Sequence, residues 1–282
     1  TRPRLLVAKG AFEAMGGGEM DLIRVLPSIN RLFRVTMATI QPSIELEATC
    51  AENGIDLIHP DPKWELRTDP LSVVMDSGRG TASKAWGRCP GLGEAIESAV
   101  AIHMVSGDGS LPLLDHVPHG TRVHLHLLEP HRGLYEDTLH RRVDGSPRRN
   151  LTLTKAALSR ARRRDRSLMA DLTSREGAMI SCNSNFSAGR AKEVYGIEAG
   201  VLWPCVDTEE FAEDSAGDPE NPYPGNHEYV VSIGRASFAK GTWETISMLS
   251  GTGLSLAHVG GGDEPSIRML RSHAESSGVG LW

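Results

Sequence analysis

The chain has 282 residues, of which 39% are hydrophobic and 23% charged, and its formal net charge is −6. These values are ordinary for a soluble globular protein, and the length allows two domains. No stretch approaches the ~20 consecutive apolar residues that a membrane span needs, and the negative charge argues against a dedicated nucleic-acid binder. The cysteines form no CxxC pair, so neither a zinc site nor a disulfide framework is predicted; they are Cys50, Cys89, Cys182 and Cys205.

The N-terminal part alternates between strand and helix patterns. Short apolar runs predict strands, and apolar residues at helical spacing predict helices, in the order strand 4–9, helix 19–33, strand 35–40, helix 43–52 and strand 55–58. Pro27 interrupts the first helix and predicts a kink or a later start. This order implies a parallel sheet with right-handed crossovers.

The pattern continues after an irregular stretch at 60–80 and is then broken by a linker. The later predicted elements are strands 99–104 and 122–128, helix 150–172, strand 178–182, helix 186–195 and strand 200–203. Residues 207–228 contain few large apolar side chains and are typical of a linker. A second αβ region follows, with strand 229–233, helix 241–250, strand 254–259 and helix 265–276. The predicted domains are therefore 1–206 and 229–282.

Three consecutive glycines, Gly16, Gly17 and Gly18, lie between the first strand and the first helix. Glycine lets a backbone approach a ligand closely, and a helix N-terminus offers free N–H groups and partial positive charge. The loop therefore fits an anion. The alternative is that the glycines only permit a turn or close packing of the helix on the sheet. Neither a dinucleotide-binding GxGxxG pattern nor a P-loop is present.

Two cations follow the strand at 229–233, in the run Gly234-Arg235 and, after a short turn, Lys240-Gly241. Arginine offers a rigid fork to phosphate oxygens, and lysine acts as a movable point charge. Loops at the carboxyl ends of parallel strands are where α/β proteins bind ligands. The alternative is a solvated surface pair, but the strand before it and the helix after it favour an anion site.

Three histidines fall on predicted strands of the first region. His103 ends one strand, while His124 and His126 share a face of the next, with Leu125 opposite. Such histidines can contact a bound hydroxyl group, stabilise developing charge or shuttle a proton; the alternative is a hydrogen-bonded core histidine. A metal site from His124, His126 and His131 lacks a supporting carboxylate motif. The chain also has no Asp-x-Asp pair for a metal–diphosphate complex.

An arginine-rich run lies between residues 140 and 166. It comprises Arg141, Arg142, Arg148, Arg149, Arg160, Arg162, Arg163, Arg164 and Arg166. One interpretation is a solvated helix face. The other is a patch that binds anionic lipid or a phosphorylated acceptor.

Taken together, the motifs and their order resemble those of the retaining glycosyltransferases of family four, which have the GT-B fold. The resemblance covers nearly the whole chain and is weakest from 60 to 120. The matching runs are Gly16-Gly17-Gly18-Glu19, Glu52-Asn53-Gly54-Ile55 with His59-Pro60, Ser181–Ser184, Tyr195-Gly196 with Val201–Phe211, Ser232–Arg235 with Lys240-Gly241, and Val259–Gly262.

The resemblance implies an α/β protein of two facing Rossmann-like domains with parallel sheets and an active site in the cleft. It implies a nucleotide-diphosphate sugar as donor, no metal, retention of anomeric configuration, and a glycan, lipid-linked or small-molecule acceptor. The implied donor-binding residues are Gly16, Gly17, Gly18, Gly234, Arg235, Lys240 and Gly261. Arg235 and Lys240 are also implied to be catalytic, with His103 or His126 facing the transferred sugar.

One departure from the family pattern concerns the C-terminal region. The family carries a Glu-x7-Glu motif late in its second domain, and this sequence reaches Trp282 without it. We therefore expect a truncated second domain and, if that domain is completed, a hexosyltransferase. The alternative is a non-catalytic GT-B-like binding module or partner subunit. A Rossmann-type epimerase or dehydrogenase would need a GxGxxG or a Tyr-x-x-x-Lys pair, and neither is present.

The same features lead to an expectation about location. Scattered cysteines that read as reduced thiols predict a cytoplasmic protein. The arginine-rich segment Arg141–Arg166 predicts peripheral contact with an anionic membrane at its inner face. The sequence leaves the sugar, the nucleotide, the acceptor and the oligomeric state open.

Overall fold

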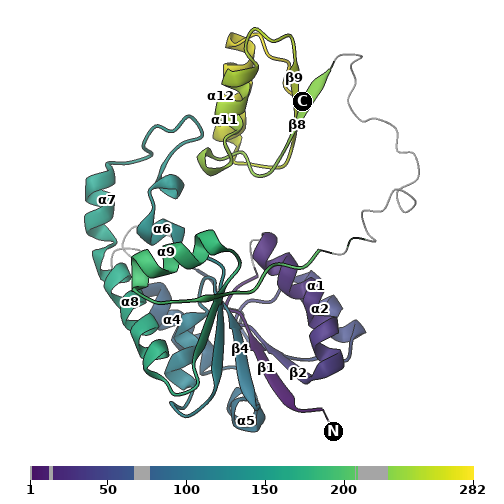
Figure 1. The fold of residues 1–282 in the computed structure, drawn as a ribbon, viewed down its shortest axis with the longest axis vertical. Coiled ribbons are helices and arrows are strands. Elements are labelled where there is room, and N and C mark those ends of the chain that lie inside the picture. The colour runs from purple at the N-terminus through teal and green to yellow at the C-terminus, as the bar shows by residue number, and fades with distance from the viewer. Residues whose placement is uncertain (1, 13–14, 67–76, 207, 209–227) are drawn as a thin grey trace. The chain divides into compact units, whose positions relative to one another are not determined.

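The computed structural model describes residues 2–12, 15–66, 77–206, 208 and 228–282. The chain divides into two units, unit 1 (Thr1–His131 and Ala156–Val206) and unit 2 (Arg132–Lys155 and Asp207–Trp282). Figure 1 shows the elements of each. The predicted linker falls almost wholly outside the described residues.

Unit 1 is built on a parallel sheet, which in the described part of the chain has seven strands in the order β3-β2-β1-β4-β5-β6-β7. The strands are β1 (Arg4–Ala8), β2 (Arg34–Ala38), β3 (Asp56–Ile58), β4 (Ala101–Val105), β5 (Val123–Leu127), β6 (Met179–Cys182) and β7 (Gly200–Val201). Every neighbouring pair is parallel. The parallel order predicted from the sequence is therefore confirmed.

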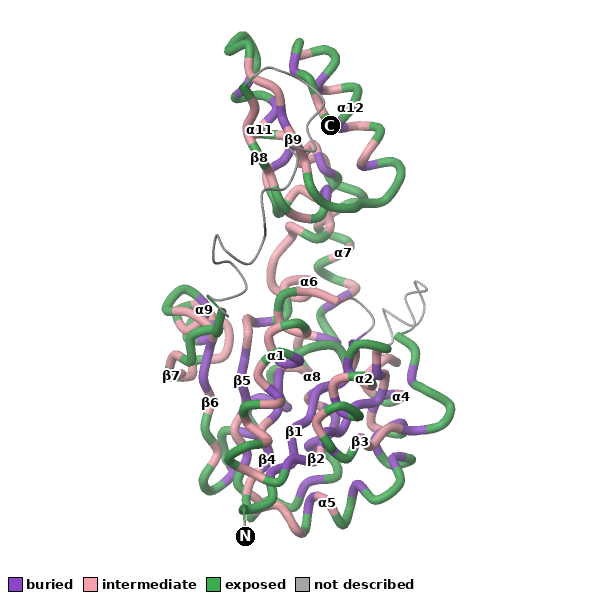
Figure 2. The backbone as a smooth tube through the Cα atoms, turned by 90° about the vertical axis from the view of Figure 1, so that its right-hand side faces the viewer, coloured by how far each residue is buried: buried purple, intermediate pink, exposed green. Residues whose placement is uncertain are grey.

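Helices pack on both faces of this sheet (Figure 1). One face receives α1 (Gly17–Leu32) and α2 (Ile44–Glu52), whose apolar side chains join those of β1 and β2 in one core. The other face receives α4 (Ser77–Trp86), α5 (Leu92–Ser98), the 3-10 turn η1 (Leu111–His116), α8 (Ser159–Ser174) and α9 (Asn185–Tyr195). Figure 2 shows buried residues concentrated on the central strands.

Alternation along the strands explains how one sheet serves two cores. On β1, Leu6 and Ala8 belong to the α8 side, while Leu5 and Val7 belong to the α1 side. Successive side chains of a strand point to opposite faces, and a central parallel strand is covered on both. The continuous apolar run of β1 follows from this position.

Two predicted helices differ from the observed ones. Helix α1 begins at Gly17 and continues through Pro27, so of the two predicted alternatives, a kink or a later start, the later start is wrong. The predicted helix 150–172 is two helices, α7 (Leu151–Ala157) and α8, separated at Leu158. The boundary between the two units falls between Lys155 and Ala156, inside α7 and just before the break.

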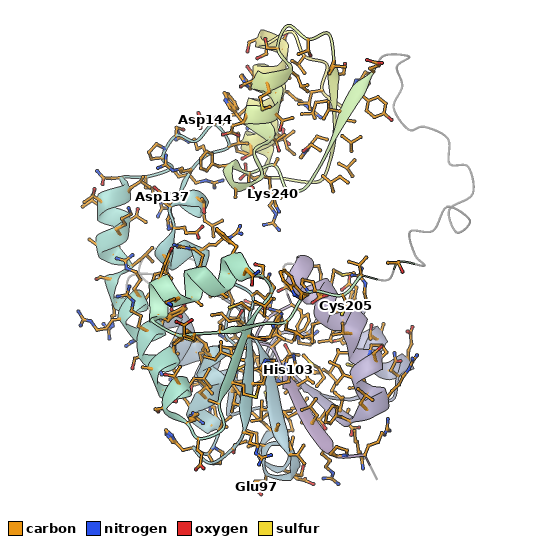
Figure 3. All side chains as sticks on the ribbon, in the orientation of Figure 1. Glu97, His103, Asp137, Asp144, Cys205 and Lys240 are labelled. Atoms are coloured by element: carbon orange, nitrogen blue, oxygen red, sulfur yellow. The ribbon has the colours of Figure 1, made fainter. Side chains whose placement is uncertain are left out.

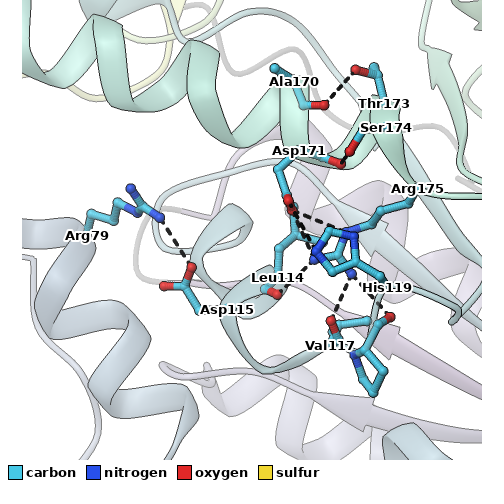
Figure 4. Close-up of polar contacts among 11 residues, drawn as sticks. Arg79, Leu114, Asp115, Val117, His119, Ala170, Asp171, Thr173, Ser174 and Arg175 are labelled. Carbon is cyan, nitrogen blue, oxygen red and sulfur yellow. Dashed lines mark hydrogen bonds and ion pairs between the residues drawn. The ribbon is translucent and has the colours of Figure 1, made fainter.

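The C-terminal end of α8 is fixed by Arg175, which is only 6% exposed. Its guanidinium donates to the carbonyl oxygens of Val117 (2.8 Å) and Leu114 (3.1 Å) and to the Asp171 carboxylate (2.9 Å), as Figure 4 shows. These bonds satisfy carbonyl groups at the end of η1, because the five N–H groups of one arginine can serve several acceptors. A buried arginine therefore joins α8 to η1.

Unit 2 has a small parallel sheet of β8 (Tyr229–Ile233) and β9 (Ser255–Val259). The 3-10 turn η3 (Phe238–Lys240) and helix α11 (Thr242–Leu249) follow β8, and α12 (Glu264–Ser276) follows β9. Ile246, Leu256 and Leu270 form part of its core. The predicted order of strand, helix, strand and helix is observed.

Unit 2 also contains the segment Arg132–Lys155, which includes α6 (Arg132–Tyr135) and η2 (Thr138–His140). The sequence analysis placed this segment in the first region. Val143 is only 1% exposed within the unit 2 core, and this apolar anchor is the physical reason for the difference. Arg141 lies over the Phe238 ring at 5.7 Å.

Candidate functional site

The carboxyl end of the unit 1 sheet brings the loops after β1 and β4 together. A Cβ atom on Gly10 would collide with the backbone of Asp108 and Gly109, so only glycine permits this approach. The Gly10 amide donates to the Ser110 hydroxyl oxygen at 2.9 Å. The edge of the sheet is therefore built from two tightly joined backbones.

The predicted glycine loop lies at the same edge and opens α1. Gly16 caps the helix, and its amide donates to the Glu19 carboxylate at 3.0 Å. Gly17 and Gly18 are in the first helical turn, where backbone N–H groups have no intrahelical acceptor. A Cβ on Gly18 would collide with the Leu128 side chain, so this glycine also serves close helix–sheet packing. The packing interpretation therefore holds for Gly18, and anion binding by the loop stays a prediction.

Sequence analysis missed Lys9, the residue that ties this edge together. Its ammonium forms an ion pair with Glu19 at 2.8 Å and donates to the Ser106 carbonyl oxygen at 3.1 Å. The Lys9 side chain is 1% exposed, whereas that of Glu19 is 18% exposed. A lysine that ends an apolar strand was the available signal, because a buried charge requires a partner.

A second ion pair in unit 1 joins Asp108 to His131, with 3.3 Å between Oδ1 and Nε2. The hydrogen bond from His131 holds the pKa of the Asp108 carboxyl below its usual value. Burial alone would lower the pKa of His131, but the hydrogen bond and charge of Asp108 raise it. Both side chains remain about half exposed, so this pair can contact a ligand.

In unit 2, two glycine loops meet at the carboxyl ends of β8 and β9. The Gly234 amide donates to the Val259 carbonyl oxygen at 2.9 Å, and the Ala236 amide donates to the Gly261 carbonyl oxygen at 2.8 Å. A Cβ on Gly260 would collide with the Gly234 carbonyl. The predicted residues Gly234 and Gly261 are therefore joined on one edge of the small sheet.

The two predicted cations lie at this edge of unit 2. Arg235 and Lys240 are exposed, and neither has an ion-pair or hydrogen-bond partner for its side chain among the described residues. A Cβ on Gly234 would lie 3.4 Å from Lys240 Cδ, so the lysine stem rests on the glycine. Figure 3 labels Lys240. Nothing in the described structure neutralises these two charges.

The three predicted histidines lie together on the α1 face of the unit 1 sheet. His103 and His124 are paired in register, and their Nδ1 atoms are 2.9 Å apart. The Ser181 hydroxyl lies 2.8 Å from His124 Nε2 and 3.1 Å from His126 Nδ1. Leu125 belongs to the opposite core, which confirms that His124 and His126 share a face.

Burial lowers the pKa of each of these histidines. The pKa of His103 falls to about 4, through burial and then through the neighbouring His124 and His126. Burial also lowers the pKa values of His124 and His126, although the Asp21 carboxylate opposes the change at His126. The cluster is therefore uncharged at neutral pH. The catalytic role of His103 or His126 stays a prediction.

The remaining predicted features are distributed between the units. Arg141 belongs to unit 2 and pairs with Asp137 at 2.8 Å, whereas α8 carries the exposed Arg160 and Arg163 in unit 1. Among the described residues, no group of His, Cys, Asp and Glu side chains is arranged to hold a metal ion. Nor does any helix of the described chain have the length and apolar character needed to cross a membrane.

Comparison with solved structures shows the fold. The chain is similar to a glycosyltransferase from Rickettsia africae, with 13% identity, a TM-score of 0.61, and coverage of 100% of this chain and 68% of that one. It is also similar to Anabaena HepE in complex with UDP and glucose, with 11% identity, a TM-score of 0.57, and coverage of 98% and 68%. These neighbours have the GT-B fold, and the predicted α/β fold class is confirmed.

No family model and no curated protein sequence matches the chain. Membership of glycosyltransferase family four therefore stays a prediction.

Proposed function

We propose that this chain carries the core of a glycosyltransferase that uses a nucleotide-diphosphate sugar. One observation supports the proposal most: Arg235 and Lys240 stand exposed and without partners beside the joined glycine loops of β8 and β9. Ligands of open α/β sheets bind beyond the carboxyl ends of the strands. The GT-B neighbours include a protein in complex with UDP, which is consistent with a nucleotide donor.

The chemistry follows from where negative charge develops. When the sugar leaves, charge accumulates on the nucleoside diphosphate, and fixed cations and oriented amides stabilise it. Arg235 and Lys240 would supply the cations, while the amides of Gly17 and Gly18 in the first turn of α1 would contribute the free N–H groups of a helix terminus. The Gly16 amide already donates to Glu19, so Gly16 would contribute by letting the backbone approach the ligand. Gly234 and Gly261 would let the donor approach the backbone. Losing one such contact typically costs about 2.7–4 kcal/mol of barrier.

The test measures UDP binding by calorimetry in the double variant Arg235→Ala/Lys240→Ala. We expect the dissociation constant to rise about tenfold or more, the effect of losing charge-assisted bonds to phosphate. The matched control is Arg268→Ala/Arg271→Ala, which removes two cations from α12 of the same unit and should leave the affinity nearly unchanged.

Two outcomes would count against the proposal. Equal UDP affinity in the wild-type protein and in the Arg235→Ala/Lys240→Ala variant would remove these residues as the diphosphate site. Absence of any UDP binding by a stably folded wild-type protein would instead favour the alternative, a non-catalytic GT-B-like binding module or partner subunit.

We further propose that transfer retains the anomeric configuration, moves a hexose and needs no metal. The support for metal independence is the pair of unneutralised cations at the unit 2 edge, which supply the positive charge themselves. A donor screen with NMR detection of the anomeric proton of the product tests the stereochemistry. Adding a chelator to the UDP titration tests the metal, and a loss of affinity would contradict the proposal.

For location, we propose a cytoplasmic protein that contacts anionic membranes through the Arg141–Arg166 segment. The exposed Arg160 and Arg163 of α8 support the contact, and the free thiols of all four cysteines are consistent with a reducing compartment. Sedimentation with anionic vesicles should fall as salt is added, because surface attraction is screened. Arg160→Ser/Arg163→Ser should weaken it, and binding that ignores both salt and this substitution would contradict the contact.

A further inference from the structure

Unit 1 contains a cavity that shares only Gly18 with the proposed donor-binding residues and is also lined by His103 and His126. It has a volume of about 400 Å³ and lies on the α1 face of the sheet, over β1, β4 and β5. That volume falls within the range of about 300–1,000 Å³ of typical small-molecule sites. All of its lining residues belong to unit 1. Figure 3 labels His103 and Cys205, which are two of them.

Most of the cavity wall is apolar. Helix α1 contributes Leu22, Val25 and Ile29, while Leu5 lies on β1 and Trp203 on the stretch after β7. The Trp203 side chain is 60% exposed, which is unusual for an aromatic residue of this size. Such a wall favours a hydrocarbon or aromatic body over a sugar or a phosphate.

The polar part of the wall is the histidine cluster together with Asp21. Among the described residues, neither His103 Nε2 nor His126 Nε2 has a hydrogen-bond partner. Asp21 Oδ1 is buried and has none either. A buried carboxylate oxygen without a donor carries a desolvation cost, so the Asp21 carboxylate is under-satisfied and would gain from a donor that a ligand supplies to it.

The hydrogen bonds within the cluster determine whether each of the two unpartnered nitrogens, His103 Nε2 and His126 Nε2, is a donor or an acceptor. Neutral imidazole has one donor and one acceptor nitrogen. If the Ser181 hydroxyl donates to His124, then His126 donates to Ser181 and His124 donates to His103. His103 Nε2 is then a donor and His126 Nε2 an acceptor. If Ser181 donates to His126 instead, both roles reverse. One free nitrogen donates and the other accepts in either arrangement.

We propose that this cavity binds a small amphiphile with an apolar body and a hydrogen-bond-donating head, an alcohol or a primary amine. The head would donate to the Asp21 carboxylate, which lines the cavity, and meet the complementary pair of imidazole nitrogens, while the body would lie along α1. An anionic head is disfavoured by the Asp21 carboxylate. None of the unit 2 residues lines the cavity, and of the proposed donor-binding residues only Gly18 does.

The experiment titrates three probes of equal chain length into the protein: octan-1-ol, octan-1-amine and octanoate. Histidine labelled with 13C at ring position ε1 reports binding at the cluster by NMR, with signals assigned from the His103→Gln and His126→Gln variants. We expect saturable shifts of both rings with the alcohol and the amine. Octanoate should bind at least roughly tenfold more weakly, the size expected of one hydrogen bond to a charged group.

Four variants test whether the probes bind in this cavity. Asp21→Asn should weaken the amine by roughly tenfold and reduce the discrimination against octanoate. Asp56→Asn, which changes an exposed carboxylate on β3 outside the cavity, should change neither. Ala101→Leu should weaken all three probes because it fills the cavity from the sheet, and Val25→Phe should do the same from α1 if the strand variant fails to fold.

Several results would overturn the proposal. These are the absence of saturable shifts at the solubility limit of the alcohol, equal affinity for the amine and the carboxylate, and unchanged binding in both cavity-filling variants. Competition by UDP would also contradict it, since that would place the probes in the donor site. Failure of UDP to bind leaves these measurements unaffected, so the two proposals fail separately.

Discussion

Units 1 and 2 differ in whether the charged side chains at the carboxyl ends of their strands are paired. In unit 1, Lys9 is buried and paired with Glu19, and Asp108 is paired with His131. In unit 2, Arg235 and Lys240 are exposed without partners. A charge that is already paired fixes the local structure, whereas an unpaired one remains available to a ligand. The paired charges of unit 1 therefore have a structural role, and the unpaired charges of unit 2 are consistent with the binding role that we propose for them.

The two sheets also differ in how much of their apolar surface is buried. The central strands of unit 1 are covered on both faces. In unit 2, Leu256 of β9 is buried and Val230 of β8 is partly buried, while Val231 and Ile233 of β8 are exposed. Unit 2 therefore gains less hydrophobic stabilisation per strand, since that stabilisation follows the apolar area removed from water. Substitutions of charged residues should accordingly have large effects on stability in unit 1 and small ones in unit 2.

The largest expected effect tests this contrast directly. Lys9→Met should destabilise the protein by about 3–5 kcal/mol, because it leaves the Glu19 carboxylate without its buried partner. The matched change in unit 2, Lys240→Met, removes an exposed charge and should stay within about 0.5 kcal/mol. Urea denaturation followed by circular dichroism measures both.

A double variant separates the charge from the packing. In Lys9→Met/Glu19→Gln no charge is left unpaired, and the glutamine oxygen can still accept from the Gly16 amide. We expect it to be more stable than Lys9→Met alone, because removing both partners costs less than removing one. A cost below about 1 kcal/mol for the single change would mean that water screens the pair as it does a surface pair.

The next effect depends on pH and concerns the histidine cluster of unit 1. An unfolded histidine binds a proton near pH 6.5, but His103 in the folded chain has a pKa of about 4. Between these two pH values the unfolded state binds more protons than the folded state. The contribution of His103 to the free energy of unfolding is therefore complete above pH 6.5 and is lost as the pH drops toward 4. The loss attributable to His103 is about 3 kcal/mol.

The measurement is the free energy of unfolding from pH 8 to pH 4 in the wild-type protein and in His103→Gln. The variant should show a shallower acid decline, because glutamine does not titrate. His119→Gln is the control, since that side chain is 70% exposed. Identical slopes in the wild-type protein and in His103→Gln would show that burial does not keep this ring neutral.

Much of the fold could be predicted because its signals are local. Apolar runs such as Leu5–Ala8 and Val230–Ile233 predict strands by themselves, and the structure has parallel strands there. The features that were not predicted involve contacts between residues distant in sequence. Leu158, at the break between α7 and α8, is buried, and Val143 belongs to the core of unit 2. No local pattern in the sequence reports either contact.

Among the site residues, too, those close together in the sequence could be predicted and those far apart could not. Gly234, Arg235 and Lys240 were predicted because the strand, the turn and the helix that position them are contiguous. The Lys9–Glu19 pair spans a loop, and the approach of Asp21 to His126 joins a helix to a distant strand. Side chains that meet only through tertiary packing leave no spacing in the sequence to recognise.

The smallest expected effect lies in unit 2, in the exposed ion pair between Arg148 and Asp263 at 3.4 Å. Arg148→Ala should cost about 0.2–1 kcal/mol, because both side chains are about half in water. Asp263 also caps α12 by accepting from the Ser266 amide at 2.8 Å, and hydrogen bonds from Ser266 are the main cause of its lowered pKa. The pKa of Asp263 should therefore stay low in Arg148→Ala, as NMR titration of the carboxyl would show.

Asp263→Ala should lower the free energy of unfolding by more, typically about 1 kcal/mol, because it removes the cap. If Arg148→Ala were the more damaging change, the segment 132–155 would be held to unit 2 by charge rather than by Val143, and unit 2 would resemble unit 1 in its dependence on paired charges.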